Sequence, residues 1–265
     1  MDLGLTGRKA LVTGGSKGIG EGCGRALAAE GCEVVLVSRS LADLEAARGR
    51  ILESSAGAKV SIAARDLSQP GEVDALVEDF PDVDILVNNA GTTPAGPIEV
   101  VDDPAWREGW QLKVFGYINM TRRYLALMKA RRSGVIINVI GARLQNPNYI
   151  AGETGNMALA NFTVTLGAES PEWNVRVVGV DPGPIATERL LRGLRSAAKA
   201  AWGDEARYVD LVAAMPFGRA GKVEEVGATV AFLASDLAGY ITGSIVTVDG
   251  GVGNRARAGH VSPRK

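Results

Sequence analysis

The sequence predicts an α/β fold in which seven strands form one doubly wound, Rossmann-type parallel sheet in a single domain. Short apolar segments rich in β-branched residues alternate with longer segments of helical pattern, and this alternation indicates βαβ crossovers. Six of the seven strand segments are nearly continuous apolar runs, as is typical of strands covered on both faces. A chain of 265 residues, 46% of them apolar, suits one large core.

Each element follows from the same alternation. The expected strands are Lys9–Thr13, Glu33–Val37, Val60–Ala64, Ile85–Asn88, Val135–Val139, Val175–Val180 and Ile245–Val248. The helical segments between them are Gly18–Glu30, Leu41–Ser54, Trp106–Ala130, Met157–Glu169 and Val223–Leu233. We expect residues 1–252 to form the domain and the insertion 184–222 to form a helical lid over a site. Residues 253–265 read as a basic, solvated tail that holds the only histidine, His260.

The bulk composition gives no reason to expect a nucleic acid or a membrane as partner. The formal net charge is −1, and no apolar run approaches the roughly 20 residues that a membrane helix needs. The first residues contain no apolar signal region, so we expect a cytoplasmic protein. Cys23 and Cys32 lack a metal-ligand spacing. We expect both to be buried thiols and expect no metal site.

A glycine cluster joins the first strand to the first helix. Glycines at positions 14, 15, 18 and 20 follow Thr13. Glycines permit a tight turn and let the backbone approach a pyrophosphate, while the helix N-terminus offers free amides and partial positive charge. The position of the cluster between a strand and a helix predicts a dinucleotide site.

Four motifs in the same order resemble those of the short-chain dehydrogenase/reductase family, over about residues 5 to 252. They are the glycine turn Thr13–Gly20, Asn88-Asn89-Ala90-Gly91, Asp181-Pro182-Gly183 with Thr187, and Thr242-Gly243 with Val248–Gly251. The resemblance implies a nicotinamide dinucleotide held across the carboxyl edge of the sheet, with Asp66 and Leu67 at the adenine. The implied cofactor contacts are Gly14, Ser16, Lys17, Gly18, Ile19, Gly20, Ser38, Arg39, Asp66, Leu67, Asn89, Ala90, Gly91, Lys113, Asn156, Pro182, Gly183, Ile185 and Thr187.

The end of the second strand favours NADP over NAD. In this fold an acidic residue there bonds the ribose 2′-hydroxyl and would repel a 2′-phosphate. Here the segment reads Ser38-Arg39-Ser40, without an acid. Arg39 can pair with a phosphate and stack on adenine, and Lys17 adds a cation in the glycine turn. Plain surface charges are the alternative for both.

The catalytic residues that the resemblance would imply are missing. The family uses a tyrosine as acid/base, a lysine four residues later, a serine that orients the carbonyl and an asparagine in a proton relay. Alignment by the flanking segments puts Gly141 at the serine, Gly152 at the tyrosine, Asn156 at the lysine and Lys113 at the asparagine. All four positions depart from the pattern.

Three functions remain open at this point. In the first, a rebuilt site transfers hydride: lysine and asparagine are exchanged between two facing helices, and Tyr149 supplies a displaced phenol. Glu153, four residues after Tyr149, lies on the same face if the helix starts early. In the second, the protein binds NADP(H) without redox chemistry, as a regulatory subunit. In the third, a lyase or isomerase uses Lys113 or Glu153 as base. We favour the first.

Polar residues after the fourth and fifth strands surround this site, where the doubly wound rule places ligands. They are Thr92, Thr93, Arg143, Gln145, Asn146 and Asn148. The insertion adds Arg189, Arg192, Arg195 and Lys199, which either meet an acidic group of a substrate or form a solvated helix face. Apolar stripes on Trp106–Ala130 and Met157–Glu169 match the helices that the family uses between subunits, so we expect a homotetramer or homodimer.

Overall fold

The computed structural model describes residues 2–142 and 144–257. Its sheet has seven parallel strands in the order β3-β2-β1-β4-β5-β6-β7. Their bounds are β1 (Lys9–Thr13), β2 (Glu33–Ser38), β3 (Lys59–Ala64), β4 (Ile85–Asn88), β5 (Gly134–Val139), β6 (Val175–Pro182) and β7 (Ile245–Val248). The strand order reverses between β1 and β4. Ligands of doubly wound sheets bind at the carboxyl ends of the strands beside such a reversal, so the fold itself positions a site there.

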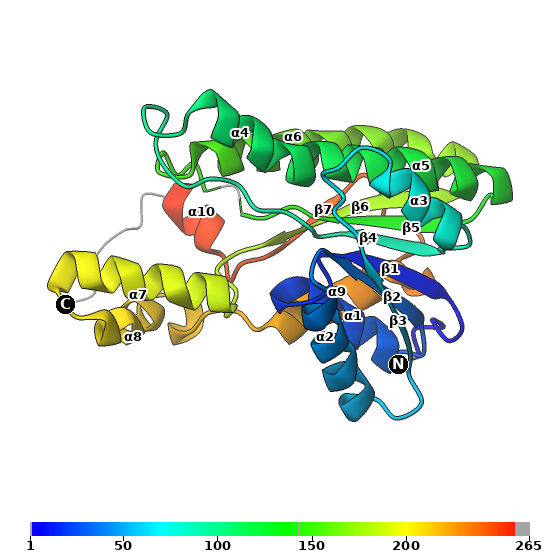
Figure 1. Cartoon of the computed structure of the whole chain (residues 1–265), viewed down its shortest axis with the longest axis horizontal. Coiled ribbons are helices and arrows are strands. Elements are labelled where there is room, and N and C mark those ends of the chain that lie inside the picture. Colours follow the sequence, from blue (N-terminus) through cyan, green and yellow to red (C-terminus); the bar gives the residue numbers. More distant parts are fainter. Residues whose placement is uncertain (1, 143, 258–265) are drawn as a thin grey trace.

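Helices cover both faces of the sheet (Figure 1). One face carries α1 (Gly18–Ala29), α2 (Leu41–Ser54) and α9 (Val223–Ala234), and the other carries α3 (Glu72–Asp79), α5 (Gly116–Arg131) and α6 (Ile150–Glu169). Two large apolar clusters fill these layers. Every residue of the central strands β4 and β5 is buried, because both of their faces are covered.

Two helices differ from the expected bounds. The segment expected as one helix over Trp106–Ala130 is divided into α4 (Asp103–Trp110), the π-helical turn η1 (Gln111–Phe115) and α5. The apolar periodicity of the sequence does not reveal this π-helical turn. The helix expected to begin at Met157 begins at Ile150, seven residues earlier. Its first turns contain glycines, which weaken a helical pattern.

The insertion before α9 is helical, with α7 (Glu188–Trp202), η3 (Glu205–Arg207), α8 (Tyr208–Ala213) and η4 (Pro216–Gly218). In Figure 1, α7 and α8 form an arm that extends away from the sheet. The 3-10 turns η2 (Ser170–Trp173) and η5 (Asp236–Ala238) follow α6 and α9. After β7 the chain continues into α10 (Val252–Arg257), which includes the first residues expected in the basic tail. His260 lies outside the described residues. No described helix is long and apolar enough to span a membrane.

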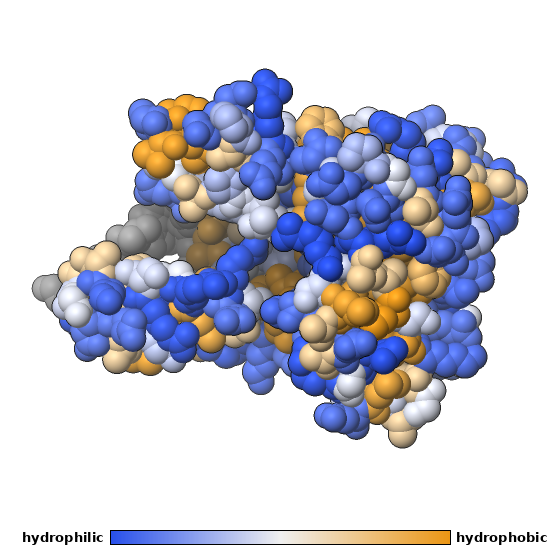
Figure 2. Space-filling model, viewed as in Figure 1, coloured by the Kyte–Doolittle hydropathy of each residue, from blue (hydrophilic) through white to orange (hydrophobic). Residues whose placement is uncertain are grey.

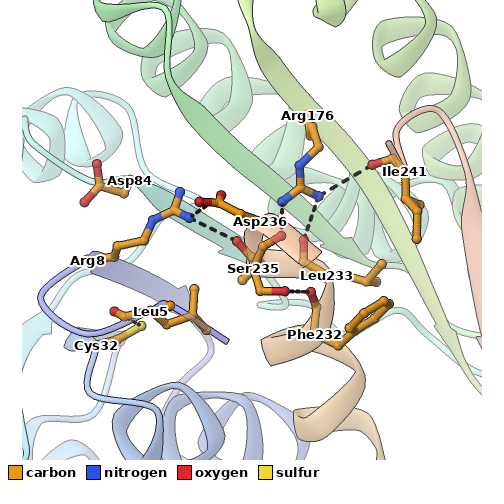
Figure 3. Close-up of polar contacts among 12 residues, drawn as sticks. Leu5, Arg8, Cys32, Asp84, Arg176, Phe232, Leu233, Ser235, Asp236 and Ile241 are labelled. Atoms are coloured by element: carbon orange, nitrogen blue, oxygen red, sulfur yellow. Dashed lines mark hydrogen bonds and ion pairs between the residues drawn. The ribbon is translucent and has the colours of Figure 1, made fainter. Parts of the chain in front are cut away.

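Two arginines close the C-terminal end of α9, near the starts of β1 and β6 (Figure 3). Arg176 of β6 donates to the carbonyl oxygens of Leu233 at 2.7 Å and Ser235 at 2.9 Å. Arg8 donates to that of Ala234 at 3.3 Å. The last carbonyls of a helix lack intrahelical partners and carry partial negative charge. The arginines therefore fasten α9 to the first and sixth strands.

Replacing Arg176 by methionine should lower the free energy of unfolding by about 1–3 kcal/mol, since two buried carbonyl groups lose a charged donor. Urea denaturation measures the change. Arg192→Met, on the exposed side of α7, is the matched control and should shift stability by less than about 0.5 kcal/mol. Equal stability of the two variants would show that these bonds do not hold α9.

Candidate active site and dinucleotide cleft

The β1–α1 turn packs tightly against the segment that follows β4. The Thr13 hydroxyl accepts hydrogen bonds from the backbone amides of Asn89 at 2.9 Å and Ala90 at 3.0 Å. The Asn89 side-chain amide donates to the Thr13 carbonyl oxygen at 3.0 Å. Gly14 has a φ of +65°, and a Cβ there would come within 2.9 Å of Ala90 Cα. The two motifs therefore form one backbone cradle at the strand-order reversal.

A pocket of about 260 Å³ opens beside this cradle. Its lining includes Gly14, Ser16, Ser38, Arg39, Leu67, Ala90 and Gly91. The Ser38 hydroxyl is buried and has no hydrogen-bond partner among the described residues. The cradle leaves no room for a Cβ, which fits the close approach of a dinucleotide pyrophosphate. The Ser38 hydroxyl at the end of β2 fits the adenosine ribose. Arg39 is exposed at the mouth of the pocket.

Two residues proposed for the adenosine end are held by local partners. The Asp66 carboxylate accepts hydrogen bonds from the Ser68 hydroxyl at 2.6 Å and the Ser68 amide at 3.1 Å, which lower the pKa of Asp66. The Lys17 amine forms an ion pair with Asp43 at 2.9 Å and lowers the pKa of that carboxyl. Lys17 is thus paired with Asp43, whereas Arg39 lines the pocket and forms no ion pair with a described residue.

The second, larger cleft adjoins the N-terminus of α1 and has a volume of about 540 Å³. Its walls come from the segments after β4, β5 and β6 and from α7. They include Ile19, Thr92, Thr93, Asn146, Asn148, Tyr149, Gly183, Pro184, Ile185, Thr187, Arg189, Leu190 and Leu194. A Cβ on Gly18 would lie 3.2 Å from Thr187 Cγ2, so Thr187 sits against the glycine turn. This cleft is the candidate for the nicotinamide and the substrate.

Lys113 lies in the π-helical turn and directs its amine inward. A Cβ on Gly91 would lie 2.9 Å from Lys113 Cβ, so the lysine stem passes close to the Gly91 backbone. The amine donates to the carbonyl oxygen of buried Ile140 at 2.6 Å. Although the residue as a whole is half-buried, desolvation of the amine lowers its pKa from 10.5 to about 8. The Arg189 guanidinium contributes to this shift, and the Asp181 and Glu153 carboxylates oppose it.

Asn156 meets Lys113 at Gly141. Its side-chain amide donates to the Ala142 carbonyl oxygen at 2.8 Å, and its Oδ1 is buried without a partner among the described residues. A Cβ on Gly141 would lie 3.2 Å from Asn156 Nδ2 and 3.4 Å from Lys113 Nζ. Gly141 also has a φ of +112°, where a side chain is strained. The structure thus brings these three departures from the family pattern together.

Tyr149 occupies the space in front of Gly152. A Cβ on Gly152 would overlap Cε1 and Cζ of the Tyr149 ring, so the ring and a side chain at position 152 exclude each other. The Tyr149 hydroxyl is 2.6 Å from the Thr93 hydroxyl, which donates to it. Both residues line the larger cleft. A phenol therefore stands in the cleft beside position 152.

Glu153 is engaged by the loop between β5 and α6. Its carboxylate oxygens accept from the backbone amides of Leu144 at 3.2 Å and Gln145 at 3.1 Å. Helix α6 starts early enough to include Glu153, and these two hydrogen bonds tie its carboxylate to the loop. Arg143, in the same loop, lies outside the described residues. The sequence analysis placed Thr93 near the site but did not predict its hydrogen bond with Tyr149.

Comparison with known proteins gives a consistent result. A family model described as Enoyl-(Acyl carrier protein) reductase matches residues 14–253. The chain is 35% identical over 260 residues to nodulation protein G of Rhizobium meliloti, with 94% of this chain and 98% of the relative covered. It is 34% identical to the 3-oxoacyl-[acyl-carrier-protein] reductase FabG of Chlamydia pneumoniae, with 95% and 99% covered.

Among solved structures, the L-sorbose reductase of Gluconobacter frateurii, complexed with NADPH and L-sorbose, superposes with a TM-score of 0.87. It shares 33% identity, and 95% of this chain and 98% of that chain are covered. The chain therefore belongs to the short-chain dehydrogenase/reductase family, a family of oxidoreductases. The prediction of the family and of the doubly wound fold is confirmed.

The contact between Tyr149 and position 152 can be tested directly. Gly152→Ala should displace the tyrosine ring and lower the free energy of unfolding by about 1–3 kcal/mol, as overpacking does. Gly49→Ala is the matched control, because it also lies in a helix but has open space around it. This control should be neutral or stabilising by up to about 1 kcal/mol. If Gly152→Ala is as stable as the control, the ring does not occupy this space.

Proposed function

We propose that the protein is an NADP(H)-dependent oxidoreductase that interconverts a small carbonyl compound and its alcohol through a rebuilt site. Tyr149 supplies the proton and Lys113 polarises the carbonyl group. The observation that carries this proposal is the Tyr149 ring in the space in front of Gly152, with its hydroxyl in the cleft against Thr93. NADPH in the similar L-sorbose reductase supports the cofactor.

The proposed chemistry divides between the cofactor and three side chains. When bound, the nicotinamide supplies the hydride. Reduction then requires a proton at the carbonyl oxygen, which Tyr149 donates while Thr93 fixes the direction of its hydroxyl. A lysine with a pKa of about 8 is mostly an ammonium at neutral pH, so Lys113 can donate a charged hydrogen bond to the same oxygen. Asn156 offers an unpartnered oxygen to a ribose or substrate hydroxyl.

Two other functions would use the same groups differently. A lyase or isomerase would take a proton with the neutral form of Lys113, whose lowered pKa makes that form accessible. A regulatory protein would bind the dinucleotide and leave Tyr149 and Lys113 without chemistry. Turnover of NADPH against a panel of carbonyl compounds separates these functions, because only the oxidoreductase consumes the cofactor.

Exposed apolar side chains support association through η1 and α6, which we propose forms a homodimer or homotetramer. Phe115 in η1, Met157 and Val164 are 48%, 53% and 42% exposed. Exposed apolar groups on adjacent helices are typical of subunit interfaces.

NADPH should bind more tightly than NADH, because Arg39 stands at the adenosine pocket where an acid would select NAD. Arg39→Asp should invert the preference. Fluorescence titration of both cofactors against both proteins measures it. Arg192→Met, away from both pockets, is the control and should keep the wild-type ratio. A wild-type protein that prefers NADH would contradict this assignment.

Tyr149→Phe should lower the rate of carbonyl reduction about 100-fold or more and leave NADPH affinity unchanged, the usual scale for losing a general acid. The measurement is single-turnover oxidation of NADPH with the most active carbonyl of the panel. Tyr240→Phe, at a fully exposed tyrosine, is the matched control and should retain the wild-type rate. A Tyr149→Phe variant with an unchanged rate would remove Tyr149 from the mechanism.

A further inference from the structure

The larger cleft carries positive charge without a carboxylate in its lining. Arg189 is the charged side chain among the described residues that line it, and no aspartate or glutamate does so. Arg189 is exposed and forms no ion pair with any described residue. It lies in the first turn of α7, two residues after the cap residue Thr187, whose hydroxyl accepts from the Leu190 amide. A cation therefore faces the cleft without a partner of its own.

The other arginines of α7 do not share this position. Arg195 stacks over the Tyr208 ring at 4.9 Å, and neither Arg192 nor Arg195 lines the cleft. Figure 2 shows the hollow between the α7 arm and the opposite part of the molecule, with hydrophilic residues along much of the arm. Arg192 fits a solvated helix face. Arg189 does not, because it lines the cleft.

The acids of the surrounding segments do not line the cleft. Glu153 is bound by the Leu144 and Gln145 amides. Asp181 is buried at the end of β6, and Glu188 is exposed and does not line the cleft. The influence of Arg189 reaches Lys113, where it adds to the lowering of the amine pKa. Arg189 and Lys113 repel each other, so an anion bound by Arg189 would relieve this repulsion.

We infer that the substrate carries a carboxylate, which Arg189 binds while its carbonyl group faces Lys113 and Tyr149. The substrate class is thus an oxo acid and the matching hydroxy acid. A guanidinium presents two parallel N–H donors that match a carboxylate. Thr92, Thr93 and Asn148, which also line the cleft, surround the site with polar groups and suit a small polar ligand. This inference rests on the proposed function for the direction of the carbonyl.

The experiment compares acids with their uncharged esters. Pyruvate, acetoacetate and levulinate, each beside its methyl ester, are titrated calorimetrically into the protein saturated with NADP⁺. At least one acid should bind about 10-fold or more tightly than its ester, the scale expected for one charge-assisted pair at a partly exposed site. Arg189→Met should remove this difference, and Arg192→Met should keep it.

Three results would overturn the inference. No acid binds more tightly than its ester, or Arg189→Met retains the difference, or Arg189→Met weakens NADPH binding and leaves the acid preference intact. In the last case Arg189 would serve the cofactor. The assay does not require turnover. Acid preference without NADPH oxidation would keep this inference and end the oxidoreductase proposal, while oxidation with equal use of acid and ester would do the reverse.

Discussion

The inward course of the Lys113 side chain depends on two positions that have no side chain of their own. At Gly91 a Cβ would press on the lysine stem, and at Gly141 it would lie 3.4 Å from the amine. The amine then finds the Ile140 carbonyl oxygen at 2.6 Å. An amine leaves water for such a place only with a hydrogen-bond partner, and it shifts its pKa downward in doing so. The arrangement of Gly141 and Asn156 around the amine depends on this placement of Lys113.

A second exclusion works in the same way at the start of α6. The Tyr149 ring and any side chain at position 152 compete for one volume, so glycine at 152 and tyrosine at 149 belong together. A tyrosine introduced at position 152 alone would therefore clash with the Tyr149 ring. A serine introduced at position 141 would have to adopt the positive φ of Gly141, which is unfavourable for a residue with a side chain. Gly152 with Tyr149, and Gly141 with Lys113 and Asn156, form one sterically compatible set, which supports the rebuilt site that we propose.

Much of this architecture could be predicted from the sequence because it depends on local patterns. The bounds that the apolar runs predict for β1, β4 and β7 agree with the structure at every residue. Contacts between distant residues could not be predicted: the ion pair of Lys17 with Asp43, and the hydrogen bond of Thr93 with Tyr149 across 56 positions. Helix α6 was expected to begin too late because its glycines weaken the pattern. The engagement of Glu153 depends on a loop conformation that no pattern encodes.

The proposed site requires that the Lys113 amine is buried. Titration of Lys113 measures this burial and needs no known substrate. Lysine side-chain NMR of the protein, with the Lys113 signal assigned by its loss in Lys113→Met, gives the midpoint. A buried Lys113 amine should titrate with a midpoint near pH 8, with the ammonium lost as pH rises through that value. A midpoint near the ordinary lysine value of about 10.4 would place the amine in water and contradict the rebuilt site.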